Sequence, residues 1–99
     1  MAYRLKINKR FVADTRNVYR YLAEEWSFTI ADQFVEQIYE SVHKLAEIPF
    51  AGSPTLRNKN VRSISVTRHN KIYYRIKGKT ITILTLFQSK MDPAKNKYE

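Results

Sequence analysis

The hydrophobic pattern of the chain changes its period once, at the turn-rich segment Pro-Phe-Ala-Gly-Ser-Pro of residues 49–54. Before this segment, apolar residues recur every three or four positions, which predicts amphipathic helices. After it, apolar and polar residues alternate, which predicts half-buried strands. A chain of 99 residues has the length of one domain. We therefore expect a single α+β domain over residues 1–99, with residues 95–99 as a flexible tail.

Two helices are expected before Pro49, and the short link between them predicts a helical hairpin. Val18, Leu22 and Trp26, apolar residues four positions apart, predict the first helix over residues 14–26. Thr29, followed three residues later by Asp32, resembles a capping box, so the second helix is expected to begin there. It is expected to end near Ile48, because proline disfavours the helical conformation at the residue before it. The apolar stripe of this second helix comprises Ala31, Phe34, Val35, Ile38, Val42, Leu45 and Ala46.

Four strands are expected from the alternation of apolar and polar residues. They cover residues 3–7, 61–67, 71–77 and 80–87, with a tight hairpin turn at Gly78 and Lys79. The last strand is apolar on both faces, which is typical of a central strand. Its expected faces are Ile81, Ile83 and Phe87 on one side and Leu84 and Leu86 on the other. The expected fold is β-α-α-β-β-β, with the helical hairpin packed on one face of a four-stranded, mostly antiparallel sheet.

The net positive charge of the chain comes entirely from its second half. Residues 1–50 carry seven basic and seven acidic side chains, whereas residues 51–99 carry eleven and two, which gives the whole net charge of +9. Such a half attracts nucleic acid or an acidic protein. The absence of cysteine excludes disulfides, Cys-based metal sites and thiol nucleophiles. No segment has the ~18 consecutive apolar residues of a transmembrane helix, so we expect a cytoplasmic protein without membrane contact.

Four segments resemble, in this order and spacing, the RelE/ParE superfamily of toxins from bacterial type II toxin–antitoxin modules. They are Ile-Pro-Phe-Ala-Gly at 48–52, Val-Arg-Ser-Ile-Ser-Val at 61–66, His-Asn-Lys-Ile-Tyr-Tyr-Arg-Ile at 69–76, and the last strand with its basic, Asp-Pro-containing exit at 81–93. The resemblance implies a toxin of the plasmid stabilisation type. It also implies a cognate antitoxin that silences this toxin in a hetero-oligomer.

Two activities divide the superfamily. RelE-like members are metal-independent endoribonucleases that cut mRNA on the ribosome, whereas ParE-like members poison DNA gyrase without catalytic residues of their own. RelE-like nucleases usually place His or Tyr at the end of the last strand, where this chain has Phe87 and Gln88. Because an amide cannot transfer a proton, we favour the ParE-like activity. The alternatives are a RelE-like nuclease and a degenerate toxin that retains only antitoxin binding, and no metal or cofactor is expected for any of the three.

Basic and aromatic residues of the second half are the candidates for binding. Those expected to contact the target or the antitoxin are Arg62, Arg68, Lys71, Tyr73, Arg75, Lys77 and Lys90. If the chain is a nuclease, the three cations expected to stabilise the scissile phosphate are Arg62, Lys71 and Arg75. In that case His69 or Tyr73 is expected to move protons.

Several of these candidates also have a structural interpretation. Arg62 lies on the helix-facing side of its strand, where it can equally pair with a helix acid or contact a partner. His69 precedes Asn70 in a turn, and we favour a role in the turn over a role in catalysis. Tyr73 lies between basic residues on an open sheet face, where it can stack a base or be covered by an antitoxin, and we favour the second. Tyr74, on the opposite face, is expected in the core.

Overall fold

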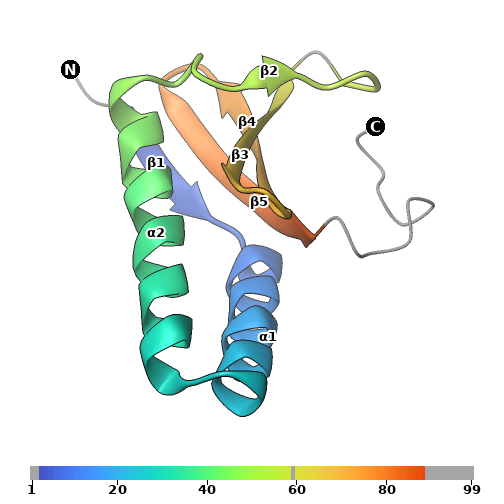
Figure 1. Cartoon of the computed structure of the whole chain (residues 1–99). Helices are drawn as coiled ribbons and strands as arrows, with labels where there is room; N and C mark the ends of the chain where they lie inside the picture. The colour runs from blue at the N-terminus through green and yellow to red at the C-terminus, as the bar shows by residue number, and fades with distance from the viewer. Residues whose placement is uncertain (1–2, 59, 89–99) are drawn as a thin grey trace.

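The computed structural model describes residues 3–58 and 60–88. Two helices cover one face of a five-stranded sheet with the strand order β1-β5-β4-β3-β2 (Figure 1). The elements are β1 (Arg4–Ile7), α1 (Lys9–Glu25), α2 (Phe28–Glu47), β2 (Ser53–Pro54), β3 (Val61–Thr67), β4 (Asn70–Lys77) and β5 (Thr80–Gln88). β1 pairs with β5 in parallel, and the other neighbours pair antiparallel. The expected α+β fold and its helical hairpin are confirmed.

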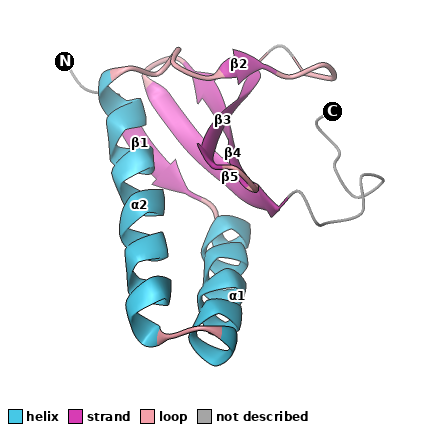
Figure 2. Cartoon of the chain, viewed as in Figure 1, coloured by secondary structure: helices cyan, strands magenta, loops and turns pink. Residues whose placement is uncertain are grey.

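One strand was not expected from the sequence. β2 contains only two residues, Ser53 and Pro54, which pair with Ser63 and Arg62 of β3. Two residues are too few to show alternation, and proline is compatible with a strand only at the edge of a sheet. β2 therefore extends the expected four-stranded sheet by a short edge strand (Figure 2).

α1 begins five residues before the position expected from the sequence, at Lys9 instead of residue 14. Its first buried residue is Phe11, and the next buried position is occupied by Thr15, which interrupts the apolar pattern. Trp26 was expected to belong to the apolar stripe, but it lies beyond the end of the helix and is 69% exposed. The prediction for this helix was therefore wrong at its start and at Trp26.

α2 has the expected apolar stripe but a different N-terminal cap. The hydroxyl of Ser27 accepts a hydrogen bond from the backbone N–H of Ile30 at 3.1 Å, so Ser27 is the N-cap and the expected capping box at Thr29 is wrong. The helix ends at Glu47, with Ile48 as C-cap, as the proline at position 49 predicted.

A β-bulge in β5 changes which side chains reach the core. Tyr73 of β4 pairs with Thr85, and Tyr74 pairs with Ile83, so Leu84 is an extra residue without a partner in the register. Beyond the bulge the alternation of side chains is reversed, because one additional residue shifts the faces of all those that follow.

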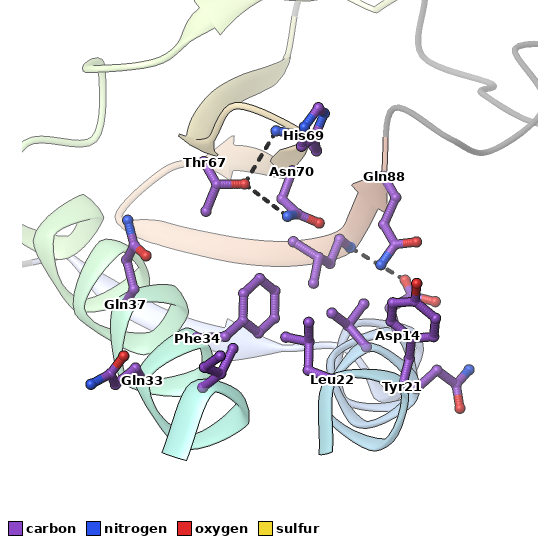
Figure 3. Close-up of a pocket in the computed structure, with 14 residues that line it drawn as sticks. Asp14, Tyr21, Leu22, Gln33, Phe34, Gln37, Thr67, His69, Asn70 and Gln88 are labelled. Carbon is purple, nitrogen blue, oxygen red and sulfur yellow. Dashed lines mark hydrogen bonds between the residues drawn. The ribbon is translucent and has the colours of Figure 1, made fainter. Parts of the chain in front are cut away.

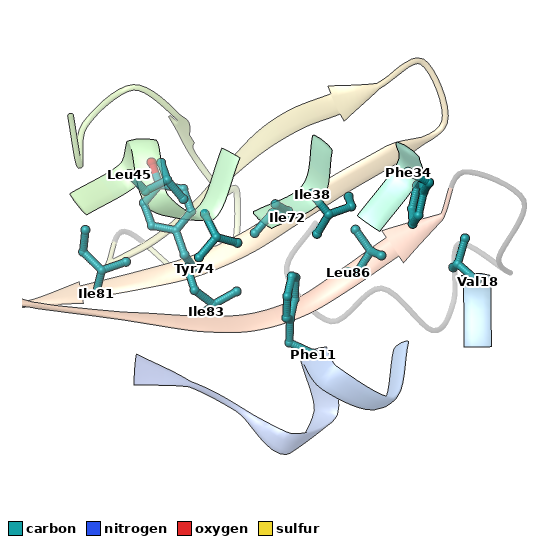
Figure 4. Close-up of a cluster of buried hydrophobic side chains, with 11 residues drawn as sticks. Phe11, Val18, Phe34, Ile38, Leu45, Ile72, Tyr74, Ile81, Ile83 and Leu86 are labelled. Carbon is teal, nitrogen blue, oxygen red and sulfur yellow. The ribbon is translucent and has the colours of Figure 1, made fainter. Parts of the chain in front are cut away.

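The bulge gives the sheet two apolar clusters, one on each face. The main core lies between the sheet and the helices and contains Phe11, Val18, Phe34, Ile38, Val42, Leu45, Ile72, Tyr74, Ile81, Ile83 and Leu86 (Figure 4). The second cluster, on the outer face away from the helices, contains Val61, Tyr73 and Leu84 with Phe87 packed against them. The expected faces of Leu86 and Phe87 are therefore exchanged, because alternation alone does not reveal a bulge.

Candidate functional site

A groove of about 800 Å³ lies between α1, α2, the β3–β4 turn and the end of β5 (Figure 3). Its apolar lining comes from Val18, Tyr21, Leu22, Ile30, Phe34 and Leu86. Its polar lining is mostly uncharged and comprises Asp14, Asn17, Gln33, Gln37, Thr67, His69, Asn70 and Gln88. An apolar groove with amide side chains around it can hold the apolar face of a peptide and hydrogen-bond its polar groups.

Two helix side chains that line the groove form hydrogen bonds with β5 and β3, each where the strand has no neighbour on one side. β1 ends at Ile7, so the next part of β5 has no neighbouring strand on that side. There Asp14 accepts hydrogen bonds from the backbone N–H of Leu86 at 3.2 Å and from the hydroxyl of Thr85 at 2.5 Å. At the opposite edge, the amide of Gln37 donates to the carbonyl oxygen of Val66 at 3.2 Å. Each helix is thus tied to a stretch of β5 or β3 that extends beyond the short strand beside it. Sequence analysis did not single out either residue.

The β3–β4 turn borders the groove, and three of the predicted site residues lie in it or beside it. The hydroxyl of Thr67 accepts hydrogen bonds from the backbone N–H of His69 at 3.2 Å and from the side-chain amide of Asn70 at 2.8 Å. Arg68, His69 and Lys71 are exposed around this turn. They line a second hollow of about 240 Å³ that opens beside the groove, on the side of Tyr73 and Phe87. The turn therefore joins the neutral groove to a basic surface.

The outer face of β4 carries the other predicted basic residues. Arg75 and Lys77 are exposed there together with Lys71, as the alternation predicted. Tyr73 lies in the same row but is fully buried, and its ring packs edge-on against Phe87 with ring centroids 6.3 Å apart. The expectation that Tyr73 lies open between the basic residues is wrong, because the bulge brings Leu84 and Phe87 beside it.

Tyr74 and Arg62 bind the segment that follows α2. The hydroxyl of Tyr74 donates to the carbonyl oxygen of Pro49 at 2.8 Å and accepts from the backbone N–H of Gly52 at 2.9 Å. The guanidinium of Arg62 donates to the carbonyl oxygen of Gly52 at 2.6 Å and lies 4.9 Å from the ring centre of Phe50. Burial raises the pKa of Tyr74, while the Gly52 N–H and the charge of Arg62 oppose this shift.

Gly52 is required at this position by space. A Cβ atom there would lie 2.5 Å from the backbone oxygen of Ser63 and 2.6 Å from the hydroxyl of Tyr74. The Pro-x-x-Gly turn, the arginine of β3 and the second tyrosine of β4 therefore form one connected structural unit. Of the two interpretations of Arg62, partner contact and pairing within the chain, the structure shows an internal contact, made with a loop carbonyl in place of a helix acid.

Some predicted features lie outside the described residues, namely Lys90 and the tail of residues 95–99. Within residues 3–58 and 60–88, no three His, Asp or Glu side chains are grouped in a way that could hold a metal ion. In the same part of the chain, neither helix has an apolar stretch long enough to cross a membrane.

Residues 5–93 match the family described as ParE toxin of type II toxin–antitoxin system, parDE. The chain belongs to the ParE toxin family. The resemblance to the RelE/ParE superfamily is thereby confirmed, and the ParE toxin is one member of a two-protein system whose other member is the cognate antitoxin. No curated protein matches the chain significantly.

Solved structures of other toxins share the fold. The chromosomal ParDE system from P. aeruginosa includes a chain that is 25% identical, with a TM-score of 0.76 over 88% of this chain and 96% of that one. A chain of the RelBE2 toxin–antitoxin complex from Mycobacterium tuberculosis is 18% identical, with a TM-score of 0.61 over 89% and 99% of the two chains. A mutant of the E. coli toxin RelE in the free state is 16% identical, with a TM-score of 0.61 over 91% and 86%. The last two likenesses concern the fold alone.

Proposed function

We propose that this ParE-family toxin inhibits growth by binding and poisoning DNA gyrase in the cytoplasm, and that its cognate antitoxin neutralises it. The observation that carries the proposal is the end of β5. There the chain has Phe87, which packs on Tyr73, and Gln88, whose amide cannot transfer a proton. Cleavage of RNA without a metal needs both a base and an acid. Tyr73 is buried, which leaves His69 as the imidazole beside the basic turn.

The surface of the molecule is consistent with a toxin that acts by binding its target and not by catalysing a reaction. Lys71, Arg75 and Lys77 form a basic row on the outer face, and such a row attracts an acidic partner and speeds its association. The groove, in contrast, has an apolar lining with amides around it and fits an apolar segment of the antitoxin. In the proposal, the target thus meets a basic surface, and the antitoxin occupies an apolar groove.

The test is a DNA cleavage assay with purified toxin and reconstituted DNA gyrase, run beside in vitro translation of a reporter mRNA. We expect the toxin to trap gyrase on cleaved DNA and to leave the mRNA intact. New internal 5′ ends in the mRNA would reject the proposal in favour of a RelE-like nuclease, with Arg62, Lys71, Arg75 and His69 as the residues to mutate. No effect in either assay would indicate a degenerate toxin that binds only its antitoxin.

A further inference from the structure

The segment between α2 and β3 presents large apolar side chains to solvent. We call residues 48–58 the anchored loop. Within it the exposed fractions are 54% for Ile48, 61% for Phe50 and 86% for Leu56, the highest value among the large apolar residues described. A single exposed apolar side chain is ordinary, but several in one short loop mark a candidate interaction surface.

Hydrogen bonds hold both halves of this loop. Tyr74 and Arg62 hold the first half through Pro49 and Gly52. In the second half, the backbone N–H of Thr55 donates to the carbonyl oxygen of Val61 at 2.9 Å, and the Thr55 hydroxyl donates to that of Asn58 at 2.8 Å. The Thr55 side chain is buried, while the next residue, Leu56, is exposed. The loop is therefore preorganised, and a preorganised loop loses less conformational entropy when it binds.

The anchored loop itself carries no negative charge, although the exposed Glu47 directly precedes it. The sequence contains no Asp or Glu between Glu47 and Asp92. Arg57 is exposed next to Leu56, and a shallow hollow of about 330 Å³ connects residues 51–54 with the exposed Lys71 on the outer face. Apart from Glu47, the charges beside the loop are positive, so an acidic partner surface complements it.

The apolar side chains favour a protein partner over a nucleic acid. Phosphate groups are bound by Arg, Lys and backbone N–H groups, and bases are stacked on aromatic rings or on Arg. The aliphatic side chain of Leu56 serves neither contact. It is suited to an apolar hollow in a protein surface, with the adjacent Arg57 meeting carboxylates at the rim.

The anchored loop and the β3–β4 turn, which borders the groove, lie at opposite ends of β3 (Figure 1). β3 runs from Val61, which follows the loop, to Thr67, which lines the groove, and a strand of this length spans roughly 20 Å. None of the residues that line the groove belongs to the loop. The lining of the groove is mainly neutral with one acid, Asp14, whereas the loop carries Arg57 and no acidic side chain, so the two surfaces differ in chemistry as well as in place.

From this we infer that the anchored loop docks on an acidic surface of the toxin's target protein, with Leu56 inserted into an apolar hollow of that surface. The inference rests on the proposed function, in which the target is a protein and the antitoxin occupies the groove. It goes further by naming the residues that hold the target and by separating them from those that hold the antitoxin.

The experiment compares the wild type with three single variants of the full chain. Leu56→Asp removes the apolar anchor and introduces a negative charge that an acidic partner repels, whereas Leu56→Lys removes the anchor and adds a positive charge to the loop. Trp26→Asp is the matched control, because Trp26 is also a large exposed apolar residue but lies between the helices. The readouts are growth inhibition on expression, trapped gyrase cleavage, affinity for the cognate antitoxin by calorimetry, and thermal unfolding by circular dichroism.

We expect L56D and L56K to lose growth inhibition and gyrase trapping by about tenfold or more, the loss typical of a central interface residue. Their antitoxin affinity and unfolding temperature should equal those of the wild type, and W26D should keep its toxicity. Full toxicity of L56D would overturn the inference, as would full toxicity of L56K, because the surface would then act by charge alone. A parallel loss of antitoxin affinity would overturn the separation of the two surfaces.

The same measurements distinguish this inference from the proposed function. If the wild type inhibits growth without trapping gyrase and L56D does not inhibit growth, gyrase is the wrong target but the docking loop stands. If the wild type traps gyrase and L56D does so equally well, the function stands and the docking loop is wrong. A wild type that does not inhibit growth overturns both.

Discussion

The two faces of the β3–β4 pair use similar residue types for different purposes. On the inner face, Arg62 and Tyr74 are engaged with the backbone of the anchored loop. On the outer face, Lys71 and Arg75 extend into solvent. The difference teaches that an arginine or tyrosine in a toxin motif is not by itself a functional residue. Its face in the sheet decides whether substitution should affect stability or binding.

The largest loss of stability is expected from Gly52→Ala. The new methyl group would lie within 2.6 Å of two atoms, one of which is the backbone oxygen of Ser63 and cannot move away by a side-chain rotation. Overpacking of this kind costs about 3 kcal/mol, which would be measured by urea denaturation followed by circular dichroism. Gly78→Ala is the control, since Gly78 has φ of 60° but open space around it, and it should cost only about 1 kcal/mol. Equal losses at the two glycines would show that the inner face tolerates displacement of the loop.

The next largest effect is expected from Tyr74→Phe. This change removes one hydroxyl and leaves both the N–H of Gly52 and the carbonyl of Pro49 without that partner, which should cost about 2 kcal/mol. Tyr19→Phe is the matched control, because the Tyr19 hydroxyl donates to Asp32 at 2.9 Å on the exposed helix surface. It should change the free energy of unfolding by less than about 0.5 kcal/mol. If Y74F is no more destabilising than Y19F, the hydroxyl does not hold the loop.

On the outer face, Arg75→Glu should leave the free energy of unfolding within about 0.5 kcal/mol of the wild type, because the side chain is exposed. It should nevertheless slow association with the proposed target, DNA gyrase, since steering depends on the local field. Arg16→Glu on α1 makes the same change of charge in the neutral half. Surface plasmon resonance at several salt concentrations should show a slower association rate for R75E only. Equal slowing by R16E would mean that the overall charge matters and the face does not.

Much of this contrast between faces could be predicted from the sequence. Alternation is a local property, so it placed Tyr74 inward and Lys71 and Arg75 outward correctly. Alternation gave the wrong faces for the β5 residues beyond Leu84, because a bulge adds one residue without changing the local composition. Because the bulge was not predicted, the burial of Tyr73 was not predicted either. The neighbours that bury Tyr73 come from β5 and the start of β3.

The groove could not be predicted in the same way. Asp14 contacts Thr85 and Leu86 across more than seventy positions of the chain, and Gln37 reaches Val66 from another helix. Such contacts depend on how the helical hairpin is placed on the sheet, which no spacing within one element reveals. The basic turn could be predicted, because Arg68, His69 and Lys71 are close in the sequence.

The smallest predicted effect is a dependence on alkaline pH that arises on the inner face. Burial raises the pKa of Tyr74 above its ordinary value of 10.0. Because the folded state binds this proton more tightly than the unfolded state, its contribution to stability is complete below pH 10 and is lost as the pH rises through the pKa of the folded protein. Tyr74→Phe removes this titration and leaves the other groups in place. Denaturation between pH 9 and pH 11 should therefore show a steeper loss of stability for the wild type than for Y74F. Parallel curves would mean that the Tyr74 hydroxyl is as accessible to water as a tyrosine of the outer surface, and the contrast between the two faces would then rest on Gly52 alone.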